Sequence, residues 1–115
     1  MIELRHLTKR YDVTTVVDDV SMVVEARSIA VIVGTSGSGK TTLMRMINRL
    51  VEPTSGTVLI DGEDTARIPP HVLRRRIGYA IQSHGLFPHR TVAQNVATVP
   101  ALLGWDPAAI EARVD

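Results

Sequence analysis

Residues 34–41 carry glycine, lysine and threonine at a spacing that suits the binding of phosphate groups. Gly34 is followed after four residues by Gly39, Lys40 and Thr41, which matches the pattern GxxxxGK[ST]. Glycines let a loop turn tightly and aim backbone N–H groups inward, where an anion meets donors and the positive end of the next helix. We expect the Lys40 ammonium to reach the β- and γ-phosphates and the Thr41 hydroxyl to bind Mg²⁺. The pattern therefore predicts a site for a nucleoside triphosphate.

The segments on either side of this loop support the prediction. Residues 29–33 form a continuous apolar run, which indicates a buried strand that leads into the loop. Over residues 42–50, Leu43, Met46 and Leu50 recur at three- and four-residue spacing, which predicts a helix. A Gly/Ser-rich surface turn is the alternative, but the order strand, loop, helix favours the phosphate site.

Composition limits the class of protein. A chain of 115 residues is one domain or a piece of one, and its lack of cysteine excludes disulfides and thiolate metal sites. No apolar stretch approaches the ~20 residues that span a bilayer, and the N-terminus lacks a signal region. A formal net charge of +1 gives no drive toward nucleic acid. The cluster at residues 74–76 is three arginines, which we interpret as a solvated face.

The remaining patterns predict further strands joined by turns. A turn near Asp12 connects the first two strands, and Asp61-Gly62 forms a tight turn after another. Adjacent Asp18 and Asp19 could be a carboxylate pair, but a solvent-facing role is favoured. The predicted strands cover residues 2–7, 16–24, 29–33, 57–60 and 77–81.

Two helix starts stand near the end of the chain. Thr91 and Gln94 form a capping box, and the helix that they begin is expected to end before Pro100. Asp106 followed by Pro107 is a second start, with Asp as N-cap and Pro at the first helical position.

With these residues in view, the chain resembles the amino-terminal half of an ATP-binding-cassette (ABC) ATPase over nearly its whole length. Tyr11 sits where such ATPases place the aromatic residue that stacks on adenine, and Val16 matches its apolar neighbour. Gln82 falls where they carry a glutamine that contacts Mg²⁺ and the attacking water. The strings at residues 47–50, 60–62, 86–89 and 97–105 look like those of importers of glycine betaine, choline, proline and related osmoprotectants.

The resemblance implies an α/β fold of the P-loop NTPase class. It implies an antiparallel β subdomain plus an incomplete, mainly parallel core sheet with helices. Residues 1–115 then form a partial nucleotide-binding domain, from the phosphate loop to the glutamine loop and the start of the helical region, with the C-terminal half absent.

The resemblance also implies the residues of the site. Lys40 and Gln82 are the catalytic candidates, and Thr41 and Gln82 the Mg²⁺ ligands. The predicted ATP-binding residues are Tyr11, Val16, Gly34, Ser36, Gly37, Ser38, Gly39, Lys40, Thr41 and Thr42.

The partners implied are those of an importer. They are membrane permease subunits, bound through residues 82–90, a second ATPase subunit in a homodimer, and indirectly an extracytoplasmic solute-binding protein; nucleic acid is not expected. The chain is expected to be cytoplasmic and peripheral on the inner face of the cell membrane. Leu86 and Phe87 offer apolar surface for a permease helix, although packing within the cassette explains them equally well.

Departures from the family pattern affect how much of it transfers. Arg27-Ser28 replaces the usual Gly-Glu turn, which suggests a turn that is either strained or rerouted. Ser83 and His84 replace a glutamine and an apolar residue. The chain ends before the signature loop, the Mg²⁺-binding aspartate with its catalytic glutamate, and the switch histidine of the family. We therefore predict that the isolated chain does not hydrolyse ATP. The alternative function is a noncatalytic remnant or interaction module that at most binds ATP. A metal site at His84 and His89 is not expected.

Overall fold

The computed structural model describes residues 1–83 and 85–115, which divide into two units, Met1–Gly78 and Tyr79–Asp115. Each unit is described by itself. The first unit contains β1 (Ile2–Tyr11), β2 (Thr14–Val24), α1 (Lys40–Ile47), β3 (Ser55–Ile60), β4 (Glu63–Asp64), the 3₁₀ helix η1 (Thr65–Arg67) and α2 (Pro70–Arg75). The second contains α3 (Val92–Leu102) and α4 (Pro107–Val114). Within the described ranges, no helix has the length and apolar character needed to cross a bilayer.

The first unit is built on a four-stranded sheet with the order β2-β1-β3-β4, in which every neighbouring pair is antiparallel. The predicted turns are confirmed, since Asp12 joins β1 to β2 with a φ of 50° and Asp61-Gly62 joins β3 to β4. Both Asp61 and Gly62 have positive φ, 50° and 81°, as a type I′ hairpin turn requires. A hydrogen bond from the N-terminal ammonium lowers the pKa of Asp61. The antiparallel β subdomain predicted from the sequence is thus present.

A β-bulge in β1 decides which side chains reach the core. Strict alternation would place Leu4 and Leu7 on opposite faces, yet both are buried. Between them His6 adopts a φ of 50°, and the pairing register with β2 and β3 shifts there. The bulge therefore turns Leu7 onto the same face as Leu4.

A matching irregularity lies in β2. Asp19 has a φ of 47°, and its carboxylate Oδ1 lies 2.8 Å from Nδ1 of His6. The Ser21 hydroxyl accepts from the backbone N–H of His6, and the Thr8 hydroxyl from that of Asp19. Asp18 and Asp19 are both exposed, which confirms their predicted solvent-facing role.

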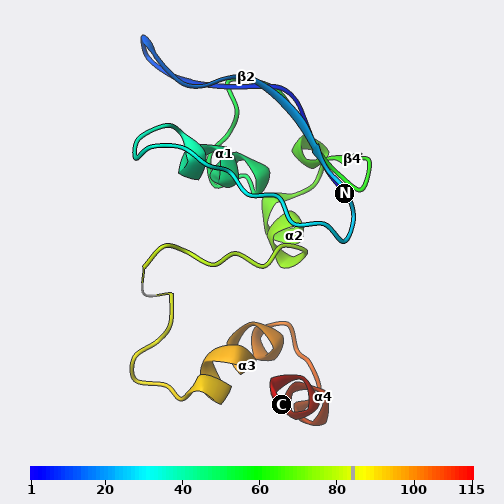
Figure 1. Ribbon diagram of the computed structural model, residues 1–115. Helices are drawn as coiled ribbons and strands as arrows, with labels where there is room; N and C mark the ends of the chain where they lie inside the picture. Colours follow the sequence, from blue (N-terminus) through cyan, green and yellow to red (C-terminus); the bar gives the residue numbers. More distant parts are fainter. Residues whose placement is uncertain (84) are drawn as a thin grey trace. The chain divides into compact units, whose positions relative to one another are not determined.

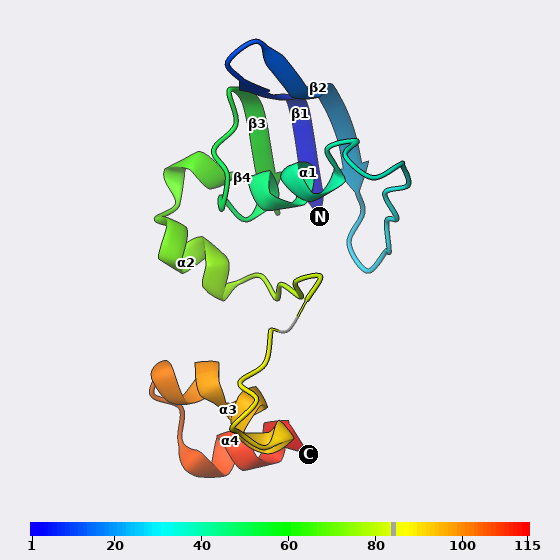
Figure 2. The ribbon, with the colours of Figure 1, turned by 90° about the vertical axis from the view of Figure 1, so that its left-hand side faces the viewer.

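The helix α1 covers one face of this sheet (Figures 1 and 2). Its Leu43 and Met46 lie one turn apart, so both point toward the strands. The buried core cluster consists of Leu4, Leu7, Val17, Leu43, Met46 and Val58. Each fully buried side chain of this kind stabilises the fold by about 1.5–3 kcal/mol, so α1 and the sheet depend on each other.

The C-terminal end of α1 is closed by a Schellman motif with arginine in the position that glycine usually takes. The backbone N–H of Leu50 donates to the carbonyl of Arg45 at 2.9 Å, and that of Arg49 to Met46 at 3.3 Å. Arg49 has a φ of 58°, which costs a residue with a Cβ about 1–2 kcal/mol.

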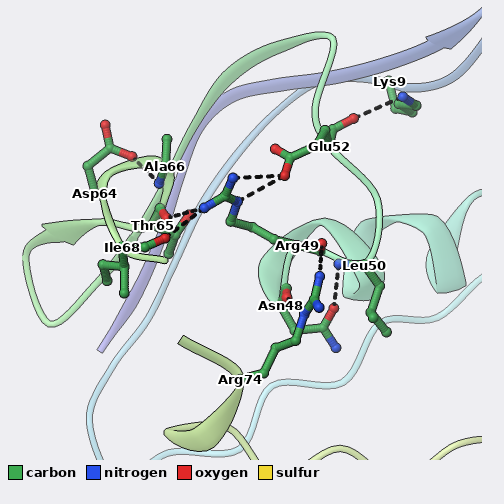
Figure 3. Close-up of polar contacts among 10 residues, drawn as sticks. All are labelled: Lys9, Asn48, Arg49, Leu50, Glu52, Asp64, Thr65, Ala66, Ile68 and Arg74. Atoms are coloured by element: carbon green, nitrogen blue, oxygen red, sulfur yellow. Dashed lines mark hydrogen bonds and ion pairs between the residues drawn. The ribbon is translucent and has the colours of Figure 1, made fainter. Parts of the chain in front are cut away.

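Two arginine side chains hold this end of α1 to the segments that follow (Figure 3). The Arg49 guanidinium donates to the carbonyls of Thr65 and Ile68 at 3.1 and 2.8 Å and pairs with Glu52 at 2.9 Å. Arg74 of α2 donates to the carbonyls of Asn48 and Arg49 at 3.2 and 2.6 Å. The arginine cluster is solvent-facing as predicted, and Arg74 has this additional role at the end of α1.

Two predicted strands are wrong. In the described chain, residues 29–33 and 77–81 form no strand, and Ile29, Val31 and Val33 are 93, 79 and 89% exposed. A strand needs a neighbouring strand to pair with its backbone N–H and C=O groups, and the sheet described above consists of the strands β1, β2, β3 and β4 alone. The parallel part of the predicted core sheet is therefore not formed by the described residues. The turn at residues 26–28 is strained as expected, since Arg27 has a φ of 62°.

In the second unit, the helix starts are confirmed and one helix end is wrong. Thr91 and Gln94 form the complete capping box, and Asp106 caps α4 through the N–H of Ala108. However, α3 continues through Pro100 to Leu102. Gly104, just after the C-cap residue Leu103, has a φ of 75° and donates from its N–H to the Ala101 carbonyl at 3.1 Å. Together with the bond from the N–H of Trp105 to the Pro100 carbonyl at 3.0 Å, it closes another Schellman motif. The stop signal was the glycine, because a proline near the end of a helix removes only one of its hydrogen bonds.

We predict that Arg49→Ala lowers the free energy of unfolding of the full-length protein by about 2 kcal/mol, because charge-assisted bonds to two carbonyls are lost while the left-handed φ remains. Arg49→Gly should be about 1 kcal/mol less damaging, since glycine adopts that φ freely. Urea denaturation of the two variants measures this difference. Equal losses in the two variants would show that backbone strain at this position is negligible.

Candidate nucleotide-binding site

The loop of residues 34–39 leads directly into α1. Gly37 and Gly39 have φ values of 81° and 90°, which other residues adopt only with strain. Gly39 is the N-cap of α1, and the first backbone bond of the helix runs from the N–H of Leu43 to the Gly39 carbonyl at 2.9 Å. The amides of the first turn, residues 40–42, thus precede that bond and are available for an anion. The helix begins at Lys40, two residues earlier than predicted.

The Lys40 side chain folds back over the loop. Its ammonium Nζ donates to the carbonyls of Gly34 and Thr35 at 2.7 and 2.6 Å and lies 3.2 Å from the Ser38 hydroxyl. The backbone of the loop therefore curves around one positive charge. Within the described chain, no carboxylate occupies the first turn of α1, so the field at this helix start is suited to an anion.

The loop is packed against the β1–β2 hairpin at Gly39. A Cβ on Gly39 would lie 2.4 Å from the backbone carbonyl oxygen of Val16, which real contacts do not allow. The structure thus brings Val16 together with the phosphate loop, as the prediction requires. This contact also explains why the position needs glycine in addition to its φ.

Tyr11 ends the same hairpin strand and pairs with Thr14 across the turn. Its ring is 48% exposed, and the Lys9 ammonium lies 4.8 Å from the ring centroid. An exposed aromatic ring of this kind can stack on a nucleobase. Tyr11, Val16 and the loop therefore all belong to one unit.

Other predicted site residues fall into two groups. Ser36, Thr41 and Thr42 lie on the loop and the first turn of α1, and each residue is at least partly exposed. Gln82 lies in the second unit, in the segment of residues 77–83 without helix or strand, so its role beside the loop stays a prediction.

The residues present fit a Mg²⁺ ion that is held mainly by a nucleotide. Among the residues that the structure describes, no cluster of three or more His, Cys, Asp or Glu could hold a metal by itself. The Thr41 hydroxyl would supply one oxygen ligand to such an ion, and Mg²⁺ prefers few protein ligands together with phosphate oxygens and water.

Asn95 holds the described residues of the predicted permease contact through hydrogen bonds, and the sequence patterns did not predict this role. Its side chain accepts from the N–H of Phe87 at 2.8 Å and donates to the carbonyls of Phe87 and Thr91 at 3.2 and 2.9 Å. The Arg90 guanidinium stacks 4.7 Å from the centre of the Phe87 ring. Residues 87–91 are thus fixed on the start of α3, and Leu86 is 70% exposed. An Asn one turn after the N-cap residue Thr91 could have indicated side-chain hydrogen bonds to the backbone of the preceding loop. The predictions about His84 lie outside the described residues.

Comparison with known proteins decides the family. The sequence model of the ABC transporter family matches residues 17–115. This chain belongs to that family. It is 50% identical over 115 residues to the glycine betaine uptake system ATP-binding protein YehX of Escherichia coli, covering 100% of this chain and 37% of that protein. It is 44% identical over 120 residues to the osmoprotectant import ATP-binding protein OsmV of Salmonella typhimurium, covering 100% of this chain and 31% of OsmV.

The fold is shared with a solved cassette. The ATP-binding cassette MJ0796, determined as a dimer bound to ADP and Pi, superposes with a TM-score of 0.81 and 27% identity. The match covers 99% of this chain and 54% of that one. The ABC cassette fold predicted from the sequence is thus confirmed, and the chain spans about a third of the length of the curated relatives reported above.

We predict that Gly39→Ala weakens ATP binding by the full-length protein at least about tenfold, because the added methyl group forces the loop away from the Val16 carbonyl. Gly37→Ala is the matched control. It has the same kind of φ, but a Cβ there would meet no described heavy atom within 4 Å. Titration with a fluorescent ATP analogue measures both. If Gly37→Ala were as damaging as Gly39→Ala, the contact with Val16 would not be what positions the loop.

Proposed function

We propose that this chain is the nucleotide-binding part of the ATPase subunit of an ABC importer for osmoprotectants, among them quaternary amines, of the glycine betaine, choline and proline type. The observation that carries the proposal is the loop of residues 34–39 curved around the Lys40 ammonium at the start of α1. The names of YehX and OsmV support the solute class. In this proposal, ATP binding and hydrolysis drive solute uptake.

The geometry suggests how a triphosphate is held. The Lys40 ammonium exchanges its neutral carbonyl acceptors for β- and γ-phosphate oxygens, which form stronger, charge-assisted bonds. The amides of the first turn of α1 donate to the phosphates, and the Tyr11 ring and Val16 receive the base. Thr41 and Gln82 would hold a Mg²⁺ ion, which would supply neutralisation of the phosphate charge.

The proposed partners follow from the family. The exposed Leu86 and the stacked Phe87 support a permease contact within residues 82–90. The structure of MJ0796 is dimeric, which supports the proposal that two copies of the full-length subunit form a homodimer. In this proposal, the solute-binding protein acts on the permease from outside the membrane. The ATPase subunit binds the permease on the cytoplasmic face of the membrane.

We also propose that residues 1–115 are the amino-terminal part of a longer cassette, in which additional strands pair with residues 29–33 and 77–81. The exposure of Ile29, Val31 and Val33 supports this, because a run that is apolar on both faces is typical of a buried parallel strand. Since the chain carries Lys40 but not the family's catalytic glutamate, we expect no ATP turnover from these residues alone.

We predict that the backbone amides of residues 29–33 exchange slowly with deuterium in the full-length protein and quickly in a fragment of residues 1–115. Pairing in a sheet protects amides, whereas an unpaired segment exchanges freely. Hydrogen exchange with mass spectrometry measures both forms, and the paired strand β1 is the internal control. Fast exchange of residues 29–33 in both forms would contradict the proposed strand.

We predict that Lys40→Ala in the full-length subunit, assembled with its permease, abolishes ATP hydrolysis and glycine betaine uptake and weakens ATP binding at least about tenfold. Uptake of radiolabelled glycine betaine into cells tests the solute class, with spermidine, a polyamine, as the added compound that should not compete. The expected competitors are choline and proline. Glycine betaine uptake that persists in cells with Lys40→Ala would contradict the proposal. ATP binding without hydrolysis by the wild-type protein would favour the noncatalytic alternative.

A further inference from the structure

Lys9 stands next to the predicted base-stacking residue and makes two contacts with its ammonium. Nζ donates to the backbone carbonyl of Glu52 at 2.9 Å and lies over the Tyr11 ring, 4.8 Å from its centroid. The separation from the ring is within the ≈ 6 Å at which a cation is attracted to an aromatic face. Figure 3 shows the bond to Glu52 at the edge of the polar group around Arg49. Lys9 therefore connects the segment after α1 to the ring.

The acceptor of Lys9 is held firmly in place. The backbone N–H of Thr54 donates to the Thr8 carbonyl at 2.9 Å, and the Thr54 hydroxyl accepts from the N–H of Arg10 at 2.9 Å. The Glu52 side chain is itself paired with Arg49. The segment of residues 52–54 is thus fixed against β1 on both sides of Lys9, so the ammonium has a defined position.

This position leaves Tyr11 with two unequal faces. The ammonium contacts both the ring and the Glu52 carbonyl, so the covered face is the one on the side of the segment that follows the C-terminal end of α1. The phosphate loop lies at the other end of α1, against Val16 of the same hairpin. A cation on one face also restrains the ring, whose side chain is otherwise nearly half exposed. Because the ammonium takes up one face of the ring, a planar ligand would stack on the opposite face.

We propose that Lys9 is a positioning residue for the nucleobase: it fixes the Tyr11 ring from one face so that a purine stacks on the other. The inference rests on the proposed function, because it concerns the same nucleotide, and it assigns a role to a side chain outside the phosphate loop. Lys9 touches the ring and not the phosphates. Its contribution therefore depends on the presence of a base in the ligand.

The test compares ATP with inorganic tripolyphosphate, which has the phosphates but no base, on the full-length protein by isothermal titration calorimetry. Lys9→Met keeps the length of the side chain and removes its charge. We expect it to weaken ATP binding about two- to fivefold and to leave tripolyphosphate binding unchanged. Lys9→Arg retains a cation and should bind ATP nearly as the wild type does.

Two further variants separate a positioning role from a general one. Arg10→Met removes a neighbouring positive charge from the same strand, whose contacts to Thr54 come from the backbone, and should leave ATP binding unchanged. Tyr11→Ala should weaken ATP binding at least about fivefold through lost stacking. In the double variant with Lys9→Met, no further loss is expected, because Lys9 acts through the ring.

Three results would overturn the inference. Tighter ATP binding by Lys9→Met would mean that the ammonium occupies the face that the base needs. Equal weakening of ATP and tripolyphosphate would mean that Lys9 acts by charge or through the fold. Additive losses in the double variant would mean that Lys9 does not act through Tyr11. The proposed function is judged separately by Lys40→Ala, which should weaken both ligands; unchanged binding of both would reject the proposed function whatever Lys9→Met shows.

Discussion

The helix α1 is fixed at both ends, and the candidate site depends on this. At its start, Gly39 lies against the Val16 carbonyl so closely that a methyl group would not fit. At its end, Arg74 and the Schellman motif occupy the carbonyls that the helix leaves free. Between these points Leu43 and Met46 are buried in the sheet. The position of the phosphate loop relative to the β1–β2 hairpin is therefore set by packing, and this packing also fixes where the hairpin residue Tyr11 lies relative to the loop.

The bulge in β1 and the matching irregularity in β2 show how the sheet is adapted to pack against α1. His6, which has a positive φ, lies between Leu4 and Leu7. Without it these two leucines would lie on opposite faces of the sheet, and only one of them could contact α1. Polar groups satisfy the bulged backbone, since Ser21 and Thr8 hydroxyls accept from the N–H groups of His6 and Asp19. Polar residues in the middle of these strands thus support the core indirectly, while their own side chains stay exposed.

The features that the sequence predicted correctly depend on neighbouring residues. The glycine pattern before Lys40, the capping box at Thr91 and the turn at Asp61 each involve atoms a few residues apart. The end of α3 was predicted wrongly although its signal, Gly104, is also local, whereas the two strands that were predicted wrongly depend on distant residues. Whether residues 29–33 form a strand depends on a partner elsewhere. Whether Gln82 reaches the loop also depends on residues far away in the sequence, and that role stays a prediction. Arg74 was hidden for the same reason, because its carbonyl acceptors lie 25 and 26 residues away in the sequence.

The state of Lys40 in the structure bears on which ligands the loop accepts. Its ammonium is already satisfied by two backbone carbonyls and has the Ser38 hydroxyl within 3.2 Å, so a ligand must offer better acceptors than these to displace them. A neutral oxygen gains nothing by this exchange, whereas a phosphate oxygen adds the attraction of opposite charges. The amides of the first turn of α1 favour the same sign of charge. Selection for an anion thus arises from competition with the loop's own carbonyls as well as from the donors that surround it.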